Sequence, residues 1–479
     1  MTAVEQSLGS VSRLRWWPLI GLAVSTTARG AVEFEPAISV GLAHTDNLTL
    51  AAENPETETI YQLIPELSLT QSGPRMTSDV DLRIEGYYYD DRSDSDVYQA
   101  FDAGMRAALD PENFFFELGA SRDQTIRDPE APIPRSNLPI TGNRVDRDDY
   151  YAGPIFEYPI GANAMVSGSY RRNWVRYDDD EAGSTFVRDF ENDSFTLSVD
   201  NYLKERGLTW AASYSADETD YGVFMPWEYR QATLEIGAWA SEGLRLFAAG
   251  GKESAWDDPF DPSLEDNFWE AGFAKHAGQS LTVEFAAGER TFGSSKRAML
   301  DYAFARGQAQ LRYTEQPTSQ GRDPYRELPL PEGLPELDDF LDRPGVAERY
   351  ILKRLDWSLS FDLRRTGFAM TVFDESREDR TQIDGTPLED EAQTGGFVTV
   401  SWQAGARTEL ELGAERIDRE FGSGREQNLR SVSLGANYSL GTRTELAFVL
   451  SRSKEDSGGG PSGLDYTADL ISLLLTRTF

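Results

Sequence analysis

The chain ends with the sequence DYTADLISLLLTRTF, which occupies residues 465–479 and finishes on an aromatic ring. Ile471, Leu473, Leu475 and Phe479 stand at odd-numbered positions, so their side chains share one face of an extended strand. Arg477 interrupts the series, because it stands where another apolar or aromatic residue would complete it. The segment therefore predicts a β-strand with one apolar face that closes the chain on an aromatic ring.

The same alternation recurs far upstream of this last strand. It is visible in SFTLSVD (residues 194–200), LDWSLSFDL (355–363) and SVSLGANYSL (431–440), where apolar and polar side chains alternate. Alternation with a period of two predicts strands that are apolar on one face and polar on the other. The mean hydropathy is only −0.50, and no stretch after residue 30 is long and apolar enough for a membrane-spanning helix.

The connections between these segments distinguish a membrane barrel from a soluble sandwich. Short turns such as KERG near Gly207 and LGTR near Gly441 alternate with longer acidic connections such as YDDDEAGSTFVRD (residues 177–189). Roughly ten short turns and eleven longer loops give about 22 strands, with about 18 to 24 as the alternatives. We therefore predict an all-β, transmembrane antiparallel β-barrel with short periplasmic turns and long extracellular loops.

This architecture predicts a location and two partners. Both termini fall on the short-turn side, which places them in the periplasm of a Gram-negative cell envelope. The barrel is expected to contact outer-membrane lipid. Residues Ile471, Leu473, Leu475 and Phe479 are typical of the signal that the barrel-assembly machinery recognises in outer-membrane β-barrels.

The N-terminus supports export from the cytoplasm. Arg13 and Arg15 precede the apolar run WWPLIGLAV (residues 16–24), and the small-residue stretch STTARGA follows it. This order predicts a signal peptide over residues 1–30, removed near Gly30, and a mature barrel over residues 31–479. A membrane-spanning helix would need about 20 apolar residues, roughly twice the length of this run.

Composition excludes several classes of function. The chain carries 81 acidic and 46 basic residues, a formal net charge of −35, which makes a nucleic-acid partner improbable. The absence of cysteine excludes disulfides, thiolate metal sites and cysteine nucleophiles.

The first two predicted strands resemble a known family. The stretches VEFEPAISVGLAHTDNLTLA (residues 32–51) and ETIYQLIPELSL (58–69) are similar to the PEP-CTERM system-associated outer-membrane protein family. The likeness rests on the Thr45, Asp46, Asn47 step and on Ile64, Pro65, Leu67 and Ser68, and the C-terminal region also resembles the family. Membership would imply association with exosortase sorting and exopolysaccharide production, and it brings no catalytic or binding residue.

The two histidines are the candidates for catalysis. A hydrolase of the Ser/His/Asn kind would need an imidazole near the extracellular rim, where His44 is expected. We interpret His44 as a rim histidine beside an Asx turn, and His276 lies next to a predicted periplasmic turn. Acidic clusters such as Asp178–Asp180 match no defined calcium loop. The sequence thus assigns no catalytic, metal or cofactor residue, and we expect no enzyme.

The polar faces of the strands define the predicted lumen. If the apolar faces meet lipid, the following acidic residues point inward: Asp79, Asp81, Glu85, Asp200, Glu235, Glu284, Asp301, Asp356, Asp362, Glu409, Glu411 and Glu415. Arg83, Arg245, Arg312 and Arg364 are the main expected counter-charges, so the lumen should be net negative. A barrel of this width is too wide for side chains to fill. The proline-rich connection at residues 315–349 predicts a lid or constriction loop.

Three functional hypotheses follow. The first is a porin-like conduit or export channel with an acidic lumen, serving an extracellular polysaccharide pathway if the family resemblance holds. The second is a closed surface or scaffold barrel that binds polymer or periplasmic export partners. A membrane-embedded hydrolase is the least favoured.

Overall fold

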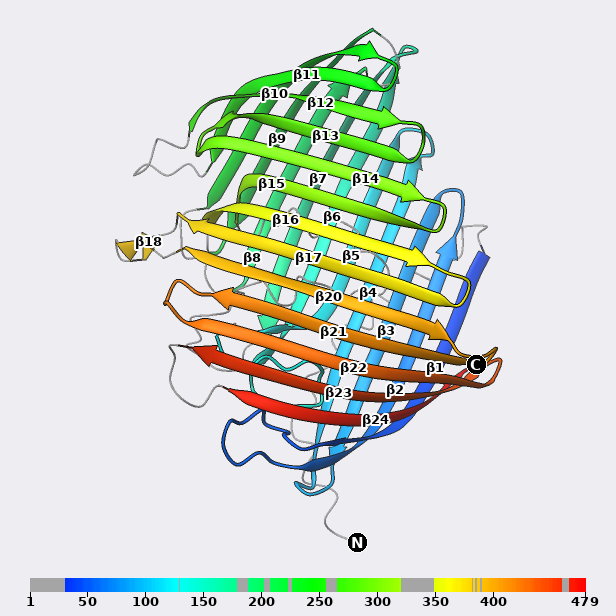
Figure 1. The fold of residues 1–479 in the computed structure, drawn as a ribbon. Helices are drawn as coiled ribbons and strands as arrows, with labels where there is room; N and C mark the ends of the chain where they lie inside the picture. Colours follow the sequence, from blue (N-terminus) through cyan, green and yellow to red (C-terminus); the bar gives the residue numbers. More distant parts are fainter. Residues whose placement is uncertain are drawn as a thin grey trace.

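The protein folds into a closed antiparallel β-barrel (Figure 1). The computed structural model describes residues 31–128, 130–178, 188–201, 207–222, 226–255, 265–319, 349–380, 382–383, 386–387, 390–458 and 465–479. Within these residues a 22-stranded sheet forms, and β24 pairs with β1 to close it. The predicted antiparallel barrel of about 22 strands is therefore confirmed. The expected signal peptide at residues 1–30 lies outside the described part.

Each barrel strand pairs with its neighbours along the chain, and β18 and β19 form a separate small sheet between β17 and β20. The strands are β1 (Ala31–Thr45), β2 (Glu58–Ser72), β3 (Met76–Tyr89), β4 (Asp94–Asp110), β5 (Phe114–Ile126), β6 (Arg144–Ile160), β7 (Ala164–Asp178), β8 (Phe190–Asp200), β9 (Leu208–Asp220), β10 (Trp227–Ser241), β11 (Leu244–Ala255), β12 (Glu265–Ala277), β13 (Leu281–Arg290), β14 (Gly293–Phe304), β15 (Gly307–Ser319), β16 (Arg349–Asp362), β17 (Thr366–Asp379), β18 (Gln382–Ile383), β19 (Thr386–Pro387), β20 (Glu391–Gln403), β21 (Thr408–Glu420), β22 (Glu426–Gly441), β23 (Thr444–Gly458) and β24 (Tyr466–Thr478).

The register sorts apolar side chains onto the outer face of the wall. Where β1 meets β24, Val40 lies opposite Leu475 and Leu42 opposite Leu473, and all four side chains are exposed. Because directly opposite residues share a face, this alternation continues from strand to strand around the barrel. The result is an apolar outer belt to which Ile471 and Leu473 also belong, and Phe479 is exposed just beyond the end of β24.

The two ends of the barrel differ in their connections. At one end, called here the short-turn end, strands are joined across intervals such as residues 73–75, 242–243 and 442–443. Gly161 and Gly243 adopt positive φ in these turns, which favours glycine. The other end, the long-loop end, carries connections such as residues 127–143. Two connections at this end, residues 90–93 and 291–292, are short.

Among the described residues, no helix has the length and apolar character needed to cross a membrane.

Candidate functional site: the barrel interior and its inward loop

The register places the predicted lumenal acids on the face opposite the apolar belt. Glu409 and Glu411 alternate with Leu410 and Leu412, and the side chain of Leu412 is exposed on the outer face. The same alternation puts the following acidic residues on the inner face: Asp79, Asp81, Glu85, Asp200, Glu235, Glu284, Asp301, Asp356, Asp362, Glu409, Glu411 and Glu415. The inner wall is therefore lined by carboxylates that come from strands all around the barrel.

Several of these carboxylates form ion pairs with arginines. Arg245 on β11 lies 2.6 Å from Glu235 on β10, and Arg83 lies 2.6 Å from Glu85 on β3. These two arginines were predicted as counter-charges from the sequence. Such pairs lower the net negative field of the wall where they occur.

Other counter-charges were not predicted. Arg297 on β14 pairs with Glu284 on β13, and Arg354 lies 2.8 Å from Asp356 on β16. Arg364 was expected on the inner face of a strand, but it lies in the connection between β16 and β17, so that assignment is wrong. The pairing of Arg297 with Glu284 depends on the register between β13 and β14, which one strand's sequence does not specify, whereas Arg354 and Asp356 stand two residues apart on the same strand.

The remaining carboxylates gather near the short-turn end. Within the described residues, no ion pair is formed by Asp79, Asp81, Asp301, Asp362, Glu409 or Glu411. Each lies in the part of its strand next to a short turn: Asp362 ends β16, and Glu409 is the second residue of β21. We name these six side chains the carboxylate ring. No ion pair neutralises these six charges within the described residues, so they add negative charge to that end of the interior, where the turns also carry arginines such as Arg306 and Arg407.

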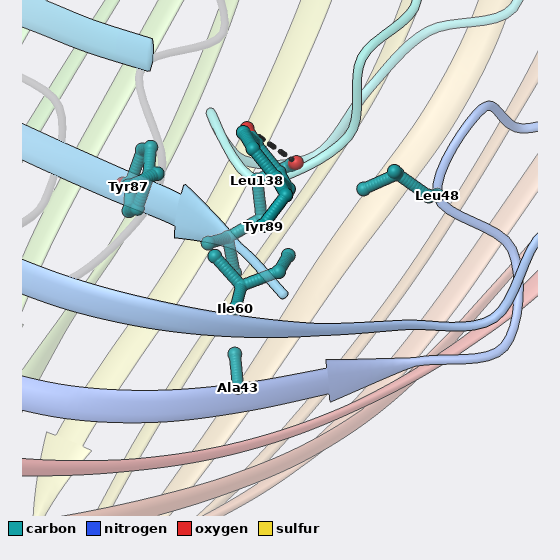
Figure 2. Packing of buried hydrophobic residues seen from close by; sticks show 6 residues of the cluster. All are labelled: Ala43, Leu48, Ile60, Tyr87, Tyr89 and Leu138. Atoms are coloured by element: carbon teal, nitrogen blue, oxygen red, sulfur yellow. Dashed lines mark hydrogen bonds between the residues drawn. The ribbon is translucent and has the colours of Figure 1, made fainter. Parts of the chain in front are cut away.

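In the connection between β5 and β6, the described residues 127–128 and 130–143, called here the inward loop, lie inside the barrel near the long-loop end. There Leu138 packs with Ile60 on β2, Tyr89 on β3 and Leu48 in the β1–β2 connection (Figure 2). The hydroxyl of Tyr89 donates a hydrogen bond to the carbonyl oxygen of Leu138 at 3.3 Å. Burial of these apolar side chains holds the loop against the inner wall.

The same loop also reaches strands near the C-terminus. The backbone N–H of Ile133 donates to Glu455 on β23 at 3.2 Å, and Tyr466 on β24 donates to the carbonyl oxygen of Ile133 at 2.8 Å. Arg135 forms an ion pair with Glu415 on β21. Because β5, β3, β24 and β21 occupy one arc of the wall, the loop bridges that arc from inside. It therefore occupies part of the lumen cross-section.

Internal hydrogen bonds give the inward loop a defined shape. The side chain of Asn143 donates to the carbonyl oxygens of Asp128 and Pro132 at 2.9 and 3.1 Å. Asn137 donates to Glu85 at 3.0 Å, which couples the loop to a predicted lumenal acid. Backbone groups satisfied by side chains in this way keep a loop in one conformation.

Residues 127–143 were not singled out in the sequence, where residues 315–349 were expected to form the lid or constriction. The predicted constriction at residues 315–349 is shorter than expected, because Glu315 to Ser319 continue β15 and pair with β16. Residues 320–348 lie outside the described part of the chain. The segment RDPEAPIPRSNLPITGN at 127–143 carries the same signal of repeated proline with Ile and Leu, so the criterion applied to 315–349 also fits it.

The two histidines lie at opposite ends of the barrel. His44 is exposed on the outer face of β1, where its Nδ1 lies 3.1 Å from the hydroxyl of Thr59. His276 lies at the short-turn end of β12, with its Nδ1 3.2 Å from the hydroxyl of Thr282. In the described part, no group of three or more His, Asp or Glu residues is placed to hold a metal ion.

These features define a class of protein: a closed β-barrel with an apolar outer belt, a polar inner wall and a loop folded into its interior. No family model and no curated protein matches the sequence, so membership of the PEP-CTERM-associated family stays a prediction.

Solved structures of outer-membrane barrels are similar in fold. They include a loop-deletion mutant of OmpT, an outer-membrane protein of Vibrio cholerae (10% identity, TM-score 0.33, 94% of this chain and 99% of that chain). A mutant ferric enterobactin receptor, PfeA from Pseudomonas aeruginosa, has 11% identity and a TM-score of 0.49 over 95% of this chain and 81% of that chain. OccAB3 of Acinetobacter baumannii has 10% identity and a TM-score of 0.37 over 94% of this chain and 99% of that chain. Identities and TM-scores this low transfer no function to this chain.

Proposed function

We propose that this protein is an outer-membrane, porin-like conduit that the inward loop narrows and whose carboxylate ring favours cations and neutral solutes. The observation that carries the proposal is the ring of unpaired carboxylates near the short-turn end, on a wall too wide for its own side chains to fill. A negative lining concentrates cations and repels anions in a water-filled pore. The apolar outer belt is the surface that such a barrel presents to lipid.

Planar-bilayer recording tests the conduit. We expect cation selectivity, seen as a reversal potential that shifts in a salt gradient. The combined variant Asp301→Asn, Glu409→Gln, Glu411→Gln should move that potential toward zero. A matched variant on the outer face, Asp418→Asn, Asp456→Asn, Asp469→Asn, removes the same charge outside the pore and should leave it unchanged. Anion selectivity of the unmodified protein would overturn the proposal.

The orientation of the barrel has its own test, because the chain contains no cysteine. We propose that the short-turn end and both termini face the periplasm. A single cysteine at Ser423 in the β21–β22 connection should react with a membrane-impermeant maleimide on intact cells. A cysteine at Ala406, in the turn between β20 and β21, should react only after lysis. The reverse labelling pattern would invert the orientation.

The resemblance of the first two strands to the PEP-CTERM-associated family is the sole support for a role in an exopolysaccharide pathway. A neutral polymer would suit an acidic lumen better than a polyanionic one, since like charges repel. Loss of surface polysaccharide on deletion of the gene, restored by the wild-type chain and not by a conductance-blocked variant, would support export.

The second candidate is a closed barrel that acts as a scaffold without conducting. It is favoured by the number of wall strands that hold the inward loop, which include β3, β21, β23 and β24. Absence of conductance both in the wild type and after release of the inward loop would favour this scaffold over the conduit.

A further inference from the structure

A row of cations crosses the outer face of three neighbouring strands. Arg416 on β21 lies directly opposite Arg430 on β22, and Arg430 lies directly opposite Lys454 on β23. All three side chains are exposed, and those of Arg416 and Lys454 are 61% and 50% accessible. Neighbouring strands are about 4.7–4.9 Å apart, so these charges are close neighbours. We name Arg416, Arg430 and Lys454 the cation row.

Like charges directly opposite each other destabilise a sheet. The outer cations are balanced only in part: Arg416 lies 2.8 Å from Asp418, and Lys454 lies 2.6 Å from Asp456. The middle residue, Arg430, donates to the neutral amide oxygen of Asn428 at 2.6 Å and has no acidic partner among the described residues. Because only the two outer cations have carboxylate partners, the positive charge of Arg430 between them calls for an anion from outside the protein.

The position of the row indicates what that anion is attached to. Toward the short-turn end, the strands continue with the exposed side chains Leu412, Leu434 and Leu450 of the apolar belt. Toward the long-loop end, Asp418 and Asp456 follow. Arg452 stands at the upper margin of the belt, opposite Val432, with its side chain 68% accessible. Along each of these three strands, the outer face therefore changes from apolar to cationic side chains within a few residues.

We propose that the cation row binds the phosphate groups of an anionic lipid whose acyl chains lie against Leu412, Leu434 and Leu450. Two guanidinium groups and an ammonium group donate to phosphate oxygens through the N–H groups that Asp418, Asn428 and Asp456 leave free. The lipid belongs to the leaflet at the long-loop end. This inference rests on the membrane position of the apolar belt proposed above.

Native mass spectrometry of the delipidated, full-length protein in detergent tests the proposal, with bisphosphorylated lipid A as the probe. The variant Arg416→Gln, Arg430→Gln, Lys454→Gln should bind it at least ~10-fold more weakly, because three charge-assisted contacts are lost. The matched control Arg230→Gln, Lys252→Gln, Lys296→Gln removes the same charge from exposed outer-face positions that form no row. It should bind lipid A like the wild type.

Three results would overturn the proposal. One is equal loss in the row variant and the matched control, which indicates general electrostatic attraction. Another is equal binding of lipid A stripped of its phosphates. The third is full competition by inorganic phosphate, which would make the ligand a free anion. Liposome flotation distinguishes failure of this proposal from failure of the proposed function. If neither the wild type nor any variant inserts into liposomes, the proposed membrane position of the apolar belt is wrong.

Stability gives a second, independent readout. In detergent without lipid A, Arg430→Gln relieves repulsion within the cation row and should raise the temperature at which the barrel unfolds on a gel. In the presence of lipid A, the same substitution should lower that temperature relative to wild type. If Arg430→Gln changed the unfolding temperature in the same direction with and without lipid A, the result would contradict lipid binding by the cation row.

Discussion

Asn47 and Thr467 are joined across the closing seam of the barrel: Nδ2 of Asn47 donates a hydrogen bond to the backbone oxygen of Thr467 at 3.0 Å. The same side-chain amide exchanges two hydrogen bonds with Ala51, both 2.9 Å long. Its neighbour Asp46 accepts a hydrogen bond from the backbone N–H of Asp469 at 2.7 Å. Asn47 is 1% exposed, so it holds β1 and the following loop to β24 from a buried position.

Replacing Asn47 should weaken the seam. Asn47→Ala removes three hydrogen bonds and leaves buried backbone groups without partners, which should cost about 1–3 kcal/mol. The measurement is the temperature at which the folded, fast-migrating form disappears on a gel. His44→Ala is the control, because its hydrogen bond to Thr59 stays within the first hairpin and its side chain is exposed. An equal effect of both substitutions would argue against a special role for Asn47.

Releasing the inward loop should widen the pore. Glu415→Gln breaks the ion pair with Arg135 that fastens the loop to β21, so single-channel conductance should rise. Asp418→Asn changes the same charge on the same strand but on the outer face, and it should leave conductance unchanged. Unaltered conductance in Glu415→Gln would mean that this ion pair does not control the opening.

A side chain at Gly119 should disturb the inner wall. Gly119 on β5 lies opposite Tyr151 on β6, and a methyl group added there would lie 2.2 Å from Cε1 of the tyrosine ring. Gly119→Ala should therefore destabilise the barrel by about 1–3 kcal/mol through overpacking. In the double variant with Tyr151→Ala the cost of the alanine should largely vanish, because the clash is gone. Additive effects on unfolding would refute this contact.

The terminal aromatic residue should matter for assembly more than for the finished barrel. Phe479 is exposed, and its backbone N–H donates to the carbonyl oxygen of Pro36 at 3.0 Å. We expect Phe479→Ala to reduce the assembled fraction in cells several-fold, while the unfolding temperature of purified barrels changes little. Arg477→Ala, two residues earlier, is the control and should assemble normally. If the wild type, Phe479→Ala and Arg477→Ala assembled equally well, Phe479 would not be part of the assembly signal.

Much of the fold follows from local sequence because each strand pairs with the next along the chain. In SVSLGANYSL the period of two assigns Val432 and Leu434 to one face, and both are exposed on the outer belt. Turns marked by glycine, such as that at Gly243, separate the strands correctly. In a barrel of sequential hairpins, most strand pairings can therefore be predicted from local sequence patterns.

The partners of the interior side chains required more than local pattern. Arg297 meets Glu284 only because of the register between β13 and β14, and Arg354 meets Asp356 on the same strand through the rotamers of both side chains. Counting acidic residues in the sequence therefore overstated the negative charge of the wall. The inward loop shows the same limit. Its proline-rich composition resembles that of residues 315–349, but its anchoring to distant strands could not be predicted from composition.

The amino-acid sequence by itself determined the strands, their number and the face on which each side chain lies, since these depend on neighbours two residues apart and on the turns between them. Only the tertiary structure decided where Arg135 and Asn47 find their partners. Glu415 lies 280 residues from Arg135, and Thr467 lies 420 residues from Asn47. Contacts of that length exist only after the wall has curved round and the last strand has paired with the first, because closure brings remote segments into one space.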